Sequence, residues 1–409
     1  MPAYKNPLYI VLFTVFVDLL GFGILIPILP ELFTGPTSAD FLGGISQNNV
    51  SLIYYGLLMG IFPLAQFFAT PVFGQLSDKF GRKKILTFAL AASSFCYLLF
   101  TFGIILKSLP ILFIARFLGG ITGGNIAVAQ SVISDISEPK DKSRNFGYIG
   151  GAFGLGFILG PFFGGQLVGF GLPISTPFWF TTIICAINTF LVWKFLPETK
   201  IKIEQSKTID WTLSIKEIGD AFKMQNLKLI LITSFLFQAG FTFLSTFIIP
   251  FIVYKFGWHP SDVGSFFGYI GIWLVFSQAY LLKFFVKFGE VKILKYCLFL
   301  SGLIIGFMLL PSDSRWLFLI APFFAIAVGF SQANITSLVS HTGTDEKQGE
   351  VMGIHSGIQA LAQAIPPIVS GFIAFGSGVS APIIISSLVM MISGIIFIIF
   401  YKNNKLKLT

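Results

Sequence analysis

Two residues of opposite charge lie inside long apolar stretches of the sequence, Asp18 in residues 8–30 and Arg116 in residues 110–134. If residues 8–30 cross a membrane as a helix, Asp18 lies about 15 Å along its axis, near the middle of the bilayer. A carboxylate at that depth is costly to bury, so it indicates a functional group. Burial disfavours its charged form, whereas a nearby guanidinium favours that form. We therefore expect Asp18, together with Arg116, to couple a proton to function; the alternative is a structural acid that stays paired to a neighbour.

A denser group of charges interrupts the apolar sequence at residues 74–84, GQLSDKFGRKK. Most of these charges are lysine or arginine, which favour the cytoplasmic side of a membrane. This preference does not explain the carboxylate of Asp78. We expect Asp78 to pair with Arg82 or to cap the positive end of a helix. Gly81 can adopt a positive φ in a tight turn, and Gly74 allows two helices to approach closely.

The composition explains why these charges are so noticeable. Of the 409 residues, 55% are hydrophobic and only 11% are charged, whereas a soluble domain carries about 25% charged residues. The apolar stretches have the length that a helix needs to cross a hydrocarbon layer of about 30 Å. The sequence therefore predicts an all-α, multi-pass membrane protein, and its net charge of +9 does not indicate a nucleic-acid partner. Cys96, Cys185 and Cys297 lie within apolar stretches and are predicted to be buried free thiols, with no metal site or disulfide.

Charges, glycines and prolines divide the chain into twelve expected transmembrane helices. Their ranges are 8–30, 50–73, 84–106, 110–134, 144–169, 177–196, 227–254, 261–284, 292–310, 315–338, 349–374 and 380–401. When the N-terminus is placed in the cytoplasm, most of the 27 Lys and Arg residues fall on inner loops, helix ends and tails. This bias predicts that both termini are cytoplasmic.

One long polar segment, residues 197–226, separates the first six expected helices from the last six. It predicts an N-terminal bundle over residues 1–196 and a C-terminal bundle over residues 227–409. Part of the segment has apolar residues at helical spacing, which predicts an amphipathic helix along the inner membrane surface. These residues are Trp211, Ile215, Ile218 and Phe222.

The two halves of the chain repeat each other. KFGRKKIL at residues 79–86 corresponds to KFGEVKIL at residues 287–294. A second correspondence, at nearly the same offset, pairs Gly147, Gly151, Pro161 and Gly165 with Gly353, Gly357, Pro367 and Gly371. Six-helix repeats are typical of transporters whose substrate site lies between the halves near the bilayer midplane. A channel or a membrane enzyme does not require this symmetry.

Several polar residues within the expected helices are candidates for the wall of a substrate cavity. They are Gln66, Asn125, Gln238, Gln332, His355 and Gln359. His355 and Gln359 are four residues apart and share one helix face with Gln363. Each of these residues, taken singly, can instead form an interhelical hydrogen bond. His355 either titrates near neutral pH or packs as a neutral imidazole.

Four motifs resemble those of the major facilitator superfamily. GQLSDKFGRKKIL, from residue 74, resembles its loop motif. DLLGFGILIPILP (residues 18–30) and RFLGGITGGNIA (residues 116–127) are similar to the helix 1 and helix 4 motifs of its drug:proton antiporters. GLGFILGPFFGG (residues 154–165) resembles the helix 5 motif associated with antiport, which comprises Gly156, Gly160, Pro161, Gly164 and Gly165. The combination resembles twelve-helix exporters such as the tetracycline:proton antiporters.

The resemblance implies a gate formed by the loop motif. In such transporters the loop carboxylate docks at the start of helix 11 and pairs with the loop arginine and an acid at the inner end of helix 4. Here these residues are Asp78, Arg82 and Asp135, and helix 11 is expected to begin near Gly349. The docking holds the inner mouth closed in the outward-open state. Val286 stands where Asp78 falls in the repeat, so the second copy cannot form the same lock.

One departure from the resemblance concerns the substrate. Tetracycline exporters carry an acid in helix 3 and another in helix 9. The matching position in helix 3 is Cys96, and residues 292–310 contain no carboxylate. This difference predicts a neutral or weakly charged amphipathic substrate in place of a tetracycline bound to a divalent cation.

The sequence therefore favours a proton-coupled secondary transporter that exports small amphipathic molecules by alternating access. We expect it to be no enzyme, to need no cofactor or metal, and to work as a monomer in the bacterial inner membrane. No G-x-x-x-x-G-K-[ST] loop is present to support ATP hydrolysis. One alternative is a transporter of a specific metabolite or siderophore without proton antiport. Another is a membrane receptor or structural protein that has lost transport, which Asp18 and Arg116 disfavour because such a protein has no need of charges at that depth.

Overall fold

The computed structural model describes residues 7–34, 49–200, 219, 225–342 and 348–401. Within these ranges every regular element is a helix. The chain divides into two compact units, which we describe separately. The first unit contains residues 1–44, 61–213 and 258–268, and the second contains residues 45–60, 214–257 and 269–409.

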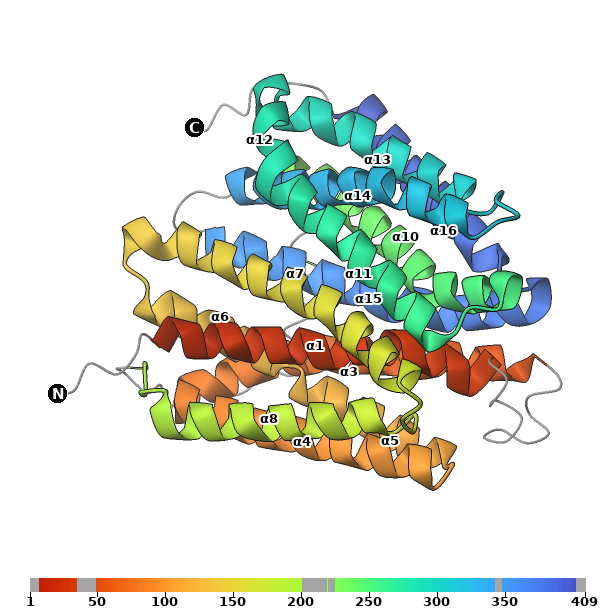
Figure 1. The fold of residues 1–409 in the computed structure, drawn as a ribbon. Coiled ribbons are helices and arrows are strands. Elements are labelled where there is room, and N and C mark those ends of the chain that lie inside the picture. The colour runs from red at the N-terminus through yellow and green to blue at the C-terminus, as the bar shows by residue number, and fades with distance from the viewer. Residues whose placement is uncertain (1–6, 35–48, 201–218, 220–224, 343–347, 402–409) are drawn as a thin grey trace. The chain divides into compact units, whose positions relative to one another are not determined.

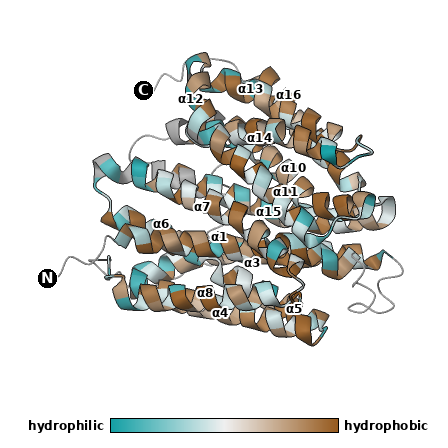
Figure 2. Ribbon diagram, viewed as in Figure 1, coloured by the Kyte–Doolittle hydropathy of each residue, from teal (hydrophilic) through white to brown (hydrophobic). Residues whose placement is uncertain are grey.

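Ten helical stretches of the described chain are long and apolar enough to cross a membrane (Figure 1). They are formed by α1 (Pro7–Thr34), α3 (Val50–Phe80), α4 (Arg82–Ile105), α5 (Leu109–Thr122) with α6 (Asn125–Ile136), α7 (Pro139–Gly169), α8 (Thr176–Phe195), α10 (Gln225–Phe256), α14 (Arg315–Thr342), α15 (Gln348–Ser377) and α16 (Ala381–Phe400). Figure 2 shows apolar residues along most of α1, α4 and α16.

The regions expected to form the eighth and ninth transmembrane helices contain shorter elements. The eighth begins as α11 (Pro260–Phe276) and continues through a π-helical turn (Ser277–Leu281), α12 (Leu282–Phe285) and a 3₁₀ turn (Val286–Phe288). The ninth is α13 (Glu290–Phe307). The number of twelve membrane crossings therefore stays a prediction. The expected amphipathic helix of the linker lies almost wholly outside the described residues.

The turn expected over residues 74–84 is much shorter than predicted, because α3 continues to Phe80 and α4 begins at Arg82. Gly81 alone separates the two helices, with a φ of 97° that favours glycine, as predicted. The close helix approach expected at Gly74 stays a prediction. A Cβ placed at Gly74 meets no atom of the described chain within 4 Å.

The single helix expected over residues 110–134 is also interrupted. Gly123 and Gly124 separate α5 from α6. The amide of Gly124 donates to the carbonyl of Ile121 at 3.2 Å, and that of Ala127 donates to Gly124 at 3.2 Å. These bonds to the third preceding residue tighten the helix locally, as in a 3₁₀ turn. The interruption gives the first residue of α6, Asn125, a fixed place next to α1, as described below.

The helices of the first unit pack around α1 through apolar side chains. α1 runs along α7 and also packs on α8, while α4 packs on α8 and α5 (Figure 1). A buried apolar cluster joins α1, α4, α6 and α8 and includes Val15, Leu90, Val132 and Val192. In a membrane, apolar contact with lipid is equally available, so helices associate through tight packing of this kind.

In the second unit, α10 packs on α15 and α16, and α13 packs on α14 and α16. Three buried serines of α16 connect these helices through hydrogen bonds to backbone carbonyls. Ser386 donates to Gly240 at 2.6 Å, Ser387 donates to Gly302 at 2.7 Å, and Ser393 donates to Thr233 at 3.0 Å. Serine hydroxyls within a bilayer commonly stabilise helix pairs in this way.

The repeat read from the sequence reappears as two equivalent glycine contacts. In the first unit, a Cβ on Gly264 of α11 would lie 2.8 Å from the carbonyl oxygen of Pro161 and 3.1 Å from the Cα of Gly165. In the second unit, a Cβ on Gly56 of α3 would lie 2.5 Å from the carbonyl oxygen of Pro367 and 2.8 Å from the Cα of Gly371. These are corresponding positions of the repeat, so each proline-containing helix, α7 or α15, contacts its partner through the same pair of glycines.

Candidate functional site

Asp18 is held by a residue from the interrupted helix. The Nδ2 atom of Asn125 donates a hydrogen bond to Oδ2 of Asp18 at 2.8 Å. Asn125 is fully buried, whereas Asp18 is half-buried. The sequence placed Asn125 among residues of a substrate cavity and did not connect it with Asp18. Because the helix tightens at Gly123 and Gly124, Asn125 begins α6 with its amide directed at the acid.

The helix 5 motif positions α1 on both sides of Asp18. A Cβ at Gly156 would lie 2.6 Å from the carbonyl oxygen of Phe16, and one at Gly160 would lie 2.6 Å from that of Leu20. Gly164 continues the same face, where a Cβ would lie 2.7 Å from the carbonyl oxygen of Ile24. These three glycines therefore bring the backbone of α7 against that of α1, while Gly165 of the same motif faces α11 in the contact described above.

Arg116 is buried beside two aromatic rings. Its guanidinium carbon lies 4.5 Å from the ring centre of Phe62 and 5.8 Å from that of Phe22, which is one helical turn beyond Asp18 on α1. Arginine above an aromatic face is attracted by the electron-rich ring, and the attraction is stronger away from water. The cation therefore lies next to Phe22 of α1, the helix that carries Asp18.

Gln66, a predicted cavity residue, stabilises the interruption between α5 and α6. Its Nε2 atom donates to the carbonyl oxygen of Gly123 at 2.9 Å. Gln66 lies one helical turn beyond Phe62 on α3, so one face of α3 contacts both the aromatic partner of Arg116 and the turn that presents Asn125. The structure therefore connects Asp18, Gln66, Arg116 and Asn125 through four neighbouring helices, α1, α3, α5 and α6.

Two further polar residues near Asp18 were not predicted from the sequence. The phenol of Tyr97 on α4 packs against Gly21 of α1, three residues beyond Asp18. Thr14, one helical turn before Asp18, donates to Oδ1 of the buried Asn188 at 3.1 Å. The sequence signal for Thr14 was its spacing of four residues from Asp18, and for Tyr97 its place next to Cys96.

The three residues of the predicted gate, Asp78, Arg82 and Asp135, lie together, and we call them the latch cluster. Arg82 Nη2 is 2.8 Å from Asp78 Oδ1, and Arg82 Nε donates to Asp135 Oδ2 at 3.1 Å. Arg82 is 6% exposed, so its charge is largely withdrawn from water and depends on these two carboxylates. The expected docking of Asp78 on the helix that begins near Gly349 stays a prediction.

Residues 196–200, which follow α8 and which we call the α8 extension, supply partners that sequence reasoning missed. The carboxylate of Glu198 accepts the backbone N–H of Arg82 at 2.8 Å and that of Lys83 at 3.1 Å, and so caps α4. Lys200 Nζ lies 2.8 Å from Asp78 Oδ1, and Thr199 Oγ1 donates to Asp135 at 3.2 Å. No local pattern signals these contacts, because they join segments more than sixty positions apart.

The candidate cavity residues of the second unit lie in different environments. His355 is 3% exposed, and its Nε2 lies 2.8 Å from the hydroxyl of Ser234 on α10. Gln238, Gln332 and Gln359 are half-buried. His355 thus connects α15 to α10 by a buried hydrogen bond, and the three glutamines remain the more accessible candidates.

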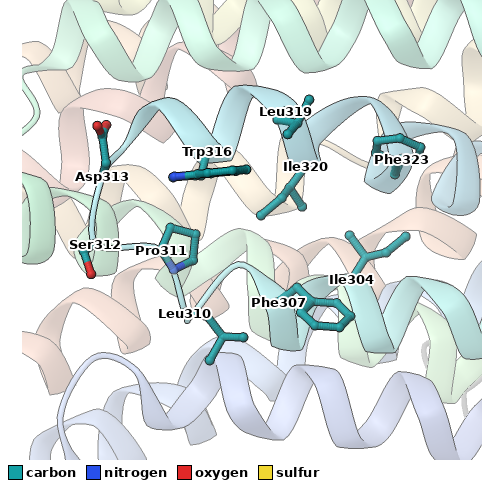
Figure 3. Close-up of a pocket in the computed structure, with 10 residues that line it drawn as sticks. All are labelled: Ile304, Phe307, Leu310, Pro311, Ser312, Asp313, Trp316, Leu319, Ile320 and Phe323. Carbon is teal, nitrogen blue, oxygen red and sulfur yellow. The ribbon is translucent and has the colours of Figure 1, made fainter.

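A separate groove of ≈ 650 Å³ lies between α13 and α14, and none of its residues was predicted as a site (Figure 3). Its walls are apolar, with Ile304 and Phe307 from α13 facing Trp316, Ile320 and neighbours from α14. Asp313 is its one acidic residue. The hydrogen bonds that Arg315 donates to Asp313 hold the pKa of that carboxyl below its ordinary value.

Comparisons with known proteins agree with the motifs. The family model of the Major Facilitator Superfamily matches residues 11–365 and 246–408. The protein named "Tetracycline resistance protein, class H" from Pasteurella multocida is 31% identical over 373 residues, which cover 90% of this chain and 89% of that relative. "Multidrug resistance protein 2" from Bacillus subtilis (strain 168) is 27% identical over 406 residues, covering 98% and 96%. The crystal structure of the human organic anion transporter MFSD10 (TETRAN) has the same fold, with a TM-score of 0.74 at 23% identity over 97% of this chain and 100% of that one.

Proposed function

We propose that this chain, which belongs to the Major Facilitator Superfamily, exports small amphipathic molecules in exchange for protons. As a member of that family it is a multi-pass membrane transporter and not an enzyme. The observation that carries the proposal is the hydrogen bond of 2.8 Å between Asn125 and Asp18, with Arg116 retained in the same unit. An acid at this depth with a neutral amide donor can alternate between its protonated and charged forms. The names of two relatives, a tetracycline resistance protein and a multidrug resistance protein, support export of drug-like compounds.

The chemistry of the site follows from what each neighbour does to the carboxyl of Asp18. Burial among apolar helices favours the protonated form, while the Asn125 amide and a nearby guanidinium favour the carboxylate. A helix movement that changes the separation of Asp18 and Arg116 shifts this balance. The proton is then taken up in one conformation and released in the other, which is the requirement for coupling in alternating access.

We propose for the whole chain the domain arrangement and membrane orientation expected from its sequence. Residues 1–196 and 227–409 form two six-helix bundles joined by the linker 197–226, with both termini in the cytoplasm of a bacterial cell and the protein working as a monomer in the inner membrane. The latch cluster closes the inner mouth in the outward-open state. The π-helical turn at Ser277–Leu281 and the prolines Pro161 and Pro367 are places where helices can adjust as the bundles move.

The substrate is proposed to be neutral or weakly charged. Cys96 occupies the position of the helix 3 acid of tetracycline exporters, and it is a buried free thiol. Apart from His355, whose imidazole is buried against Ser234, the described cavity candidates are amides, which can orient a polar group without binding a metal ion. Aromatic rings close to the site, such as Phe22 and Phe62, offer apolar contact area for such a compound.

The proposal is tested with the purified full chain in liposomes carrying an imposed pH gradient and a panel of fluorescent amphipathic drugs. We expect proton-driven transport by the native protein and its loss, by a factor of at least about one hundred, in Asp18→Asn. Asp313→Asn, which changes an exposed acid far along the chain, serves as the matched control and should transport normally. Full proton-driven transport by Asp18→Asn, in protein that elutes as a single folded species, would show that Asp18 is not the coupling group.

A further inference from the structure

A second groove, of ≈ 410 Å³, opens between the start of α4 and the end of α8, which lie side by side in the first unit (Figure 1). It is lined by Lys83, Lys84, Thr87, Phe88, Trp193 and Glu198. We propose that this groove binds an anionic glycerophospholipid of the surrounding bilayer. The phosphate contacts Lys83 and Lys84, and the first carbons of the acyl chains lie against Phe88 and Trp193.

The groove changes from charged to aromatic along the helix axis, as a phospholipid does from phosphate to acyl chain. Lys84 and Phe88 lie on one face of α4, four residues or about 6 Å apart. The ring of Phe88 is 66% exposed and that of Trp193 is 61% exposed. Exposed tryptophan in a membrane protein concentrates at the boundary between headgroups and hydrocarbon. The two lysines therefore lie at headgroup depth and the two rings at the level where the chains begin.

The charge of the groove selects an anionic headgroup. In the part of the chain that the structure describes, neither Lys83 nor Lys84 forms an ion pair. The acid of the groove, Glu198, offsets only one of the two lysine charges, and its carboxylate is directed at the backbone N–H groups of Arg82 and Lys83 at the positive end of α4, so the groove keeps a net positive charge. Basic pockets between transmembrane helices attract acidic lipid headgroups for this reason.

The repeated turn in the second unit lacks the same pair of lysines. Val291 and Lys292 occupy the positions that correspond to Lys83 and Lys84, and Glu290 precedes them. The two turns thus share a sequence pattern but differ in charge. A change of two lysines near the second turn is therefore a matched control, because it alters the net charge equally without altering the groove.

Binding is measured by native mass spectrometry on the full chain in a neutral detergent, with phosphatidylglycerol and phosphatidylcholine of identical acyl chains. We expect phosphatidylglycerol to be retained more strongly. Lys83→Gln should weaken its binding about fivefold, and the double change Lys83→Gln with Lys84→Gln about 25-fold. The control Lys292→Gln with Lys295→Gln should change it less than about twofold. Trp193→Ala should weaken the binding of both lipids, since that ring contacts the chains common to them.

Three outcomes would overturn the proposal. Equal retention of the two lipids would remove the role of headgroup charge. Equal weakening by the two double variants would mean that lipid responds to the overall positive charge and not to the groove. Displacement of phosphatidylglycerol by soluble glycerol 1-phosphate at the same concentration would assign the lysines to a soluble phosphate compound.

Discussion

The turns at Gly81 and Gly289, which correspond in the repeat, have nearly the same backbone conformation but are followed by residues of opposite charge. Gly81 has φ 97° and ψ 143°, and Gly289 has φ 83° and ψ 138°; each is the single residue before a helix, α4 or α13. At the next position the first turn has Arg82 and the second has Glu290. Backbone geometry therefore follows the repeat, whereas the side chains that make a latch occur in one copy.

The partners of these two charged residues differ as much as the residues themselves. Arg82 contacts Asp78 and Asp135 and is withdrawn from water. Glu290 accepts a hydrogen bond from the hydroxyl of Ser337 at 2.8 Å and is half-buried. The first turn is also fastened by the α8 extension through Glu198. The first turn is therefore a charge-linked assembly, whereas the second is an ordinary helix junction.

The largest effect is expected from removing the centre of the assembly. Arg82→Ala leaves Asp135 without its cation and Asp78 with Lys200 alone, and both carboxylates are about three-quarters withdrawn from solvent. We expect a loss of about 1–3 kcal/mol in the free energy of unfolding, reduced from the value for fully buried pairs because some solvent screens the acids. Transport should be abolished. The matched change Glu290→Ala should lower stability by less than about 1 kcal/mol. Unfolding in detergent, followed by tryptophan fluorescence, measures both variants, and equal losses would contradict the comparison.

The next effect tests the acid that the second turn lacks. Asp78→Asn keeps the size of the side chain but removes the charge that pairs with Arg82 and Lys200. We expect proton-driven transport to fall about tenfold, a loss that belongs to the gate, while membrane insertion and yield stay unchanged. Glu290→Gln should leave transport within about twofold of the native rate. Normal transport by Asp78→Asn would mean that the charges of this turn serve only to orient the chain in the membrane.

A sharper test uses the two glycines. Alanine at either position is strained because of the positive φ, at a cost of about 1–3 kcal/mol. Only at Gly81 does the added Cβ also meet another group, Oε2 of Glu198 at 2.5 Å; at Gly289 the described chain offers no atom within 4 Å. Displacing the capping carboxylate adds about 1 kcal/mol. Gly81→Ala should therefore unfold at a lower denaturant concentration than Gly289→Ala, and coincident midpoints would show that Glu198 does not hold the turn.

Local patterns predicted the parts of the molecule that depend on neighbours in sequence. Apolar length predicted helices, and the helix 5 motif marked Gly156, Gly160 and Gly164, which bring α7 against α1 around Asp18. The resemblance of the motif to a known family led us to expect the three residues of the latch cluster together, and Arg82 contacts both acids; its role as a gate stays a prediction. The contacts that sequence reasoning missed join distant segments: Glu198 caps a helix 116 positions away, and Asn125 reaches Asp18 across 107 positions. Such contacts leave no periodic signal, since a single polar residue at a helix end has many possible partners.

The interruption of the fourth helix shows a related limit. The glycines Gly123 and Gly124 are compatible with an uninterrupted helix in a membrane, where neighbouring segments compensate for weak backbone bonds. What stabilises the interruption is Gln66 on another helix, whose amide satisfies the carbonyl of Gly123. The interruption therefore depends on tertiary contacts, and the sequence of residues 110–134 alone does not predict it.

The smallest effect concerns Lys200, the second cation on Asp78. Its ammonium lies 2.8 Å from Asp78 Oδ1, but Arg82 holds the same oxygen at the same distance, and Lys200 remains partly open to solvent. An ion pair of this kind contributes about 0.5 kcal/mol, and salt screens it. Lys200→Gln should therefore lower transport by less than about twofold at physiological salt, with a larger difference from the native protein at low ionic strength. Transport assayed over a range of potassium chloride concentrations tests this, with Lys255→Gln as a control outside the cluster. A loss as large as that of Asp78→Asn would mean that the α8 extension, and not Arg82, principally holds the carboxylate, and the first turn would then differ from the second mainly by a contact from the chain that follows α8.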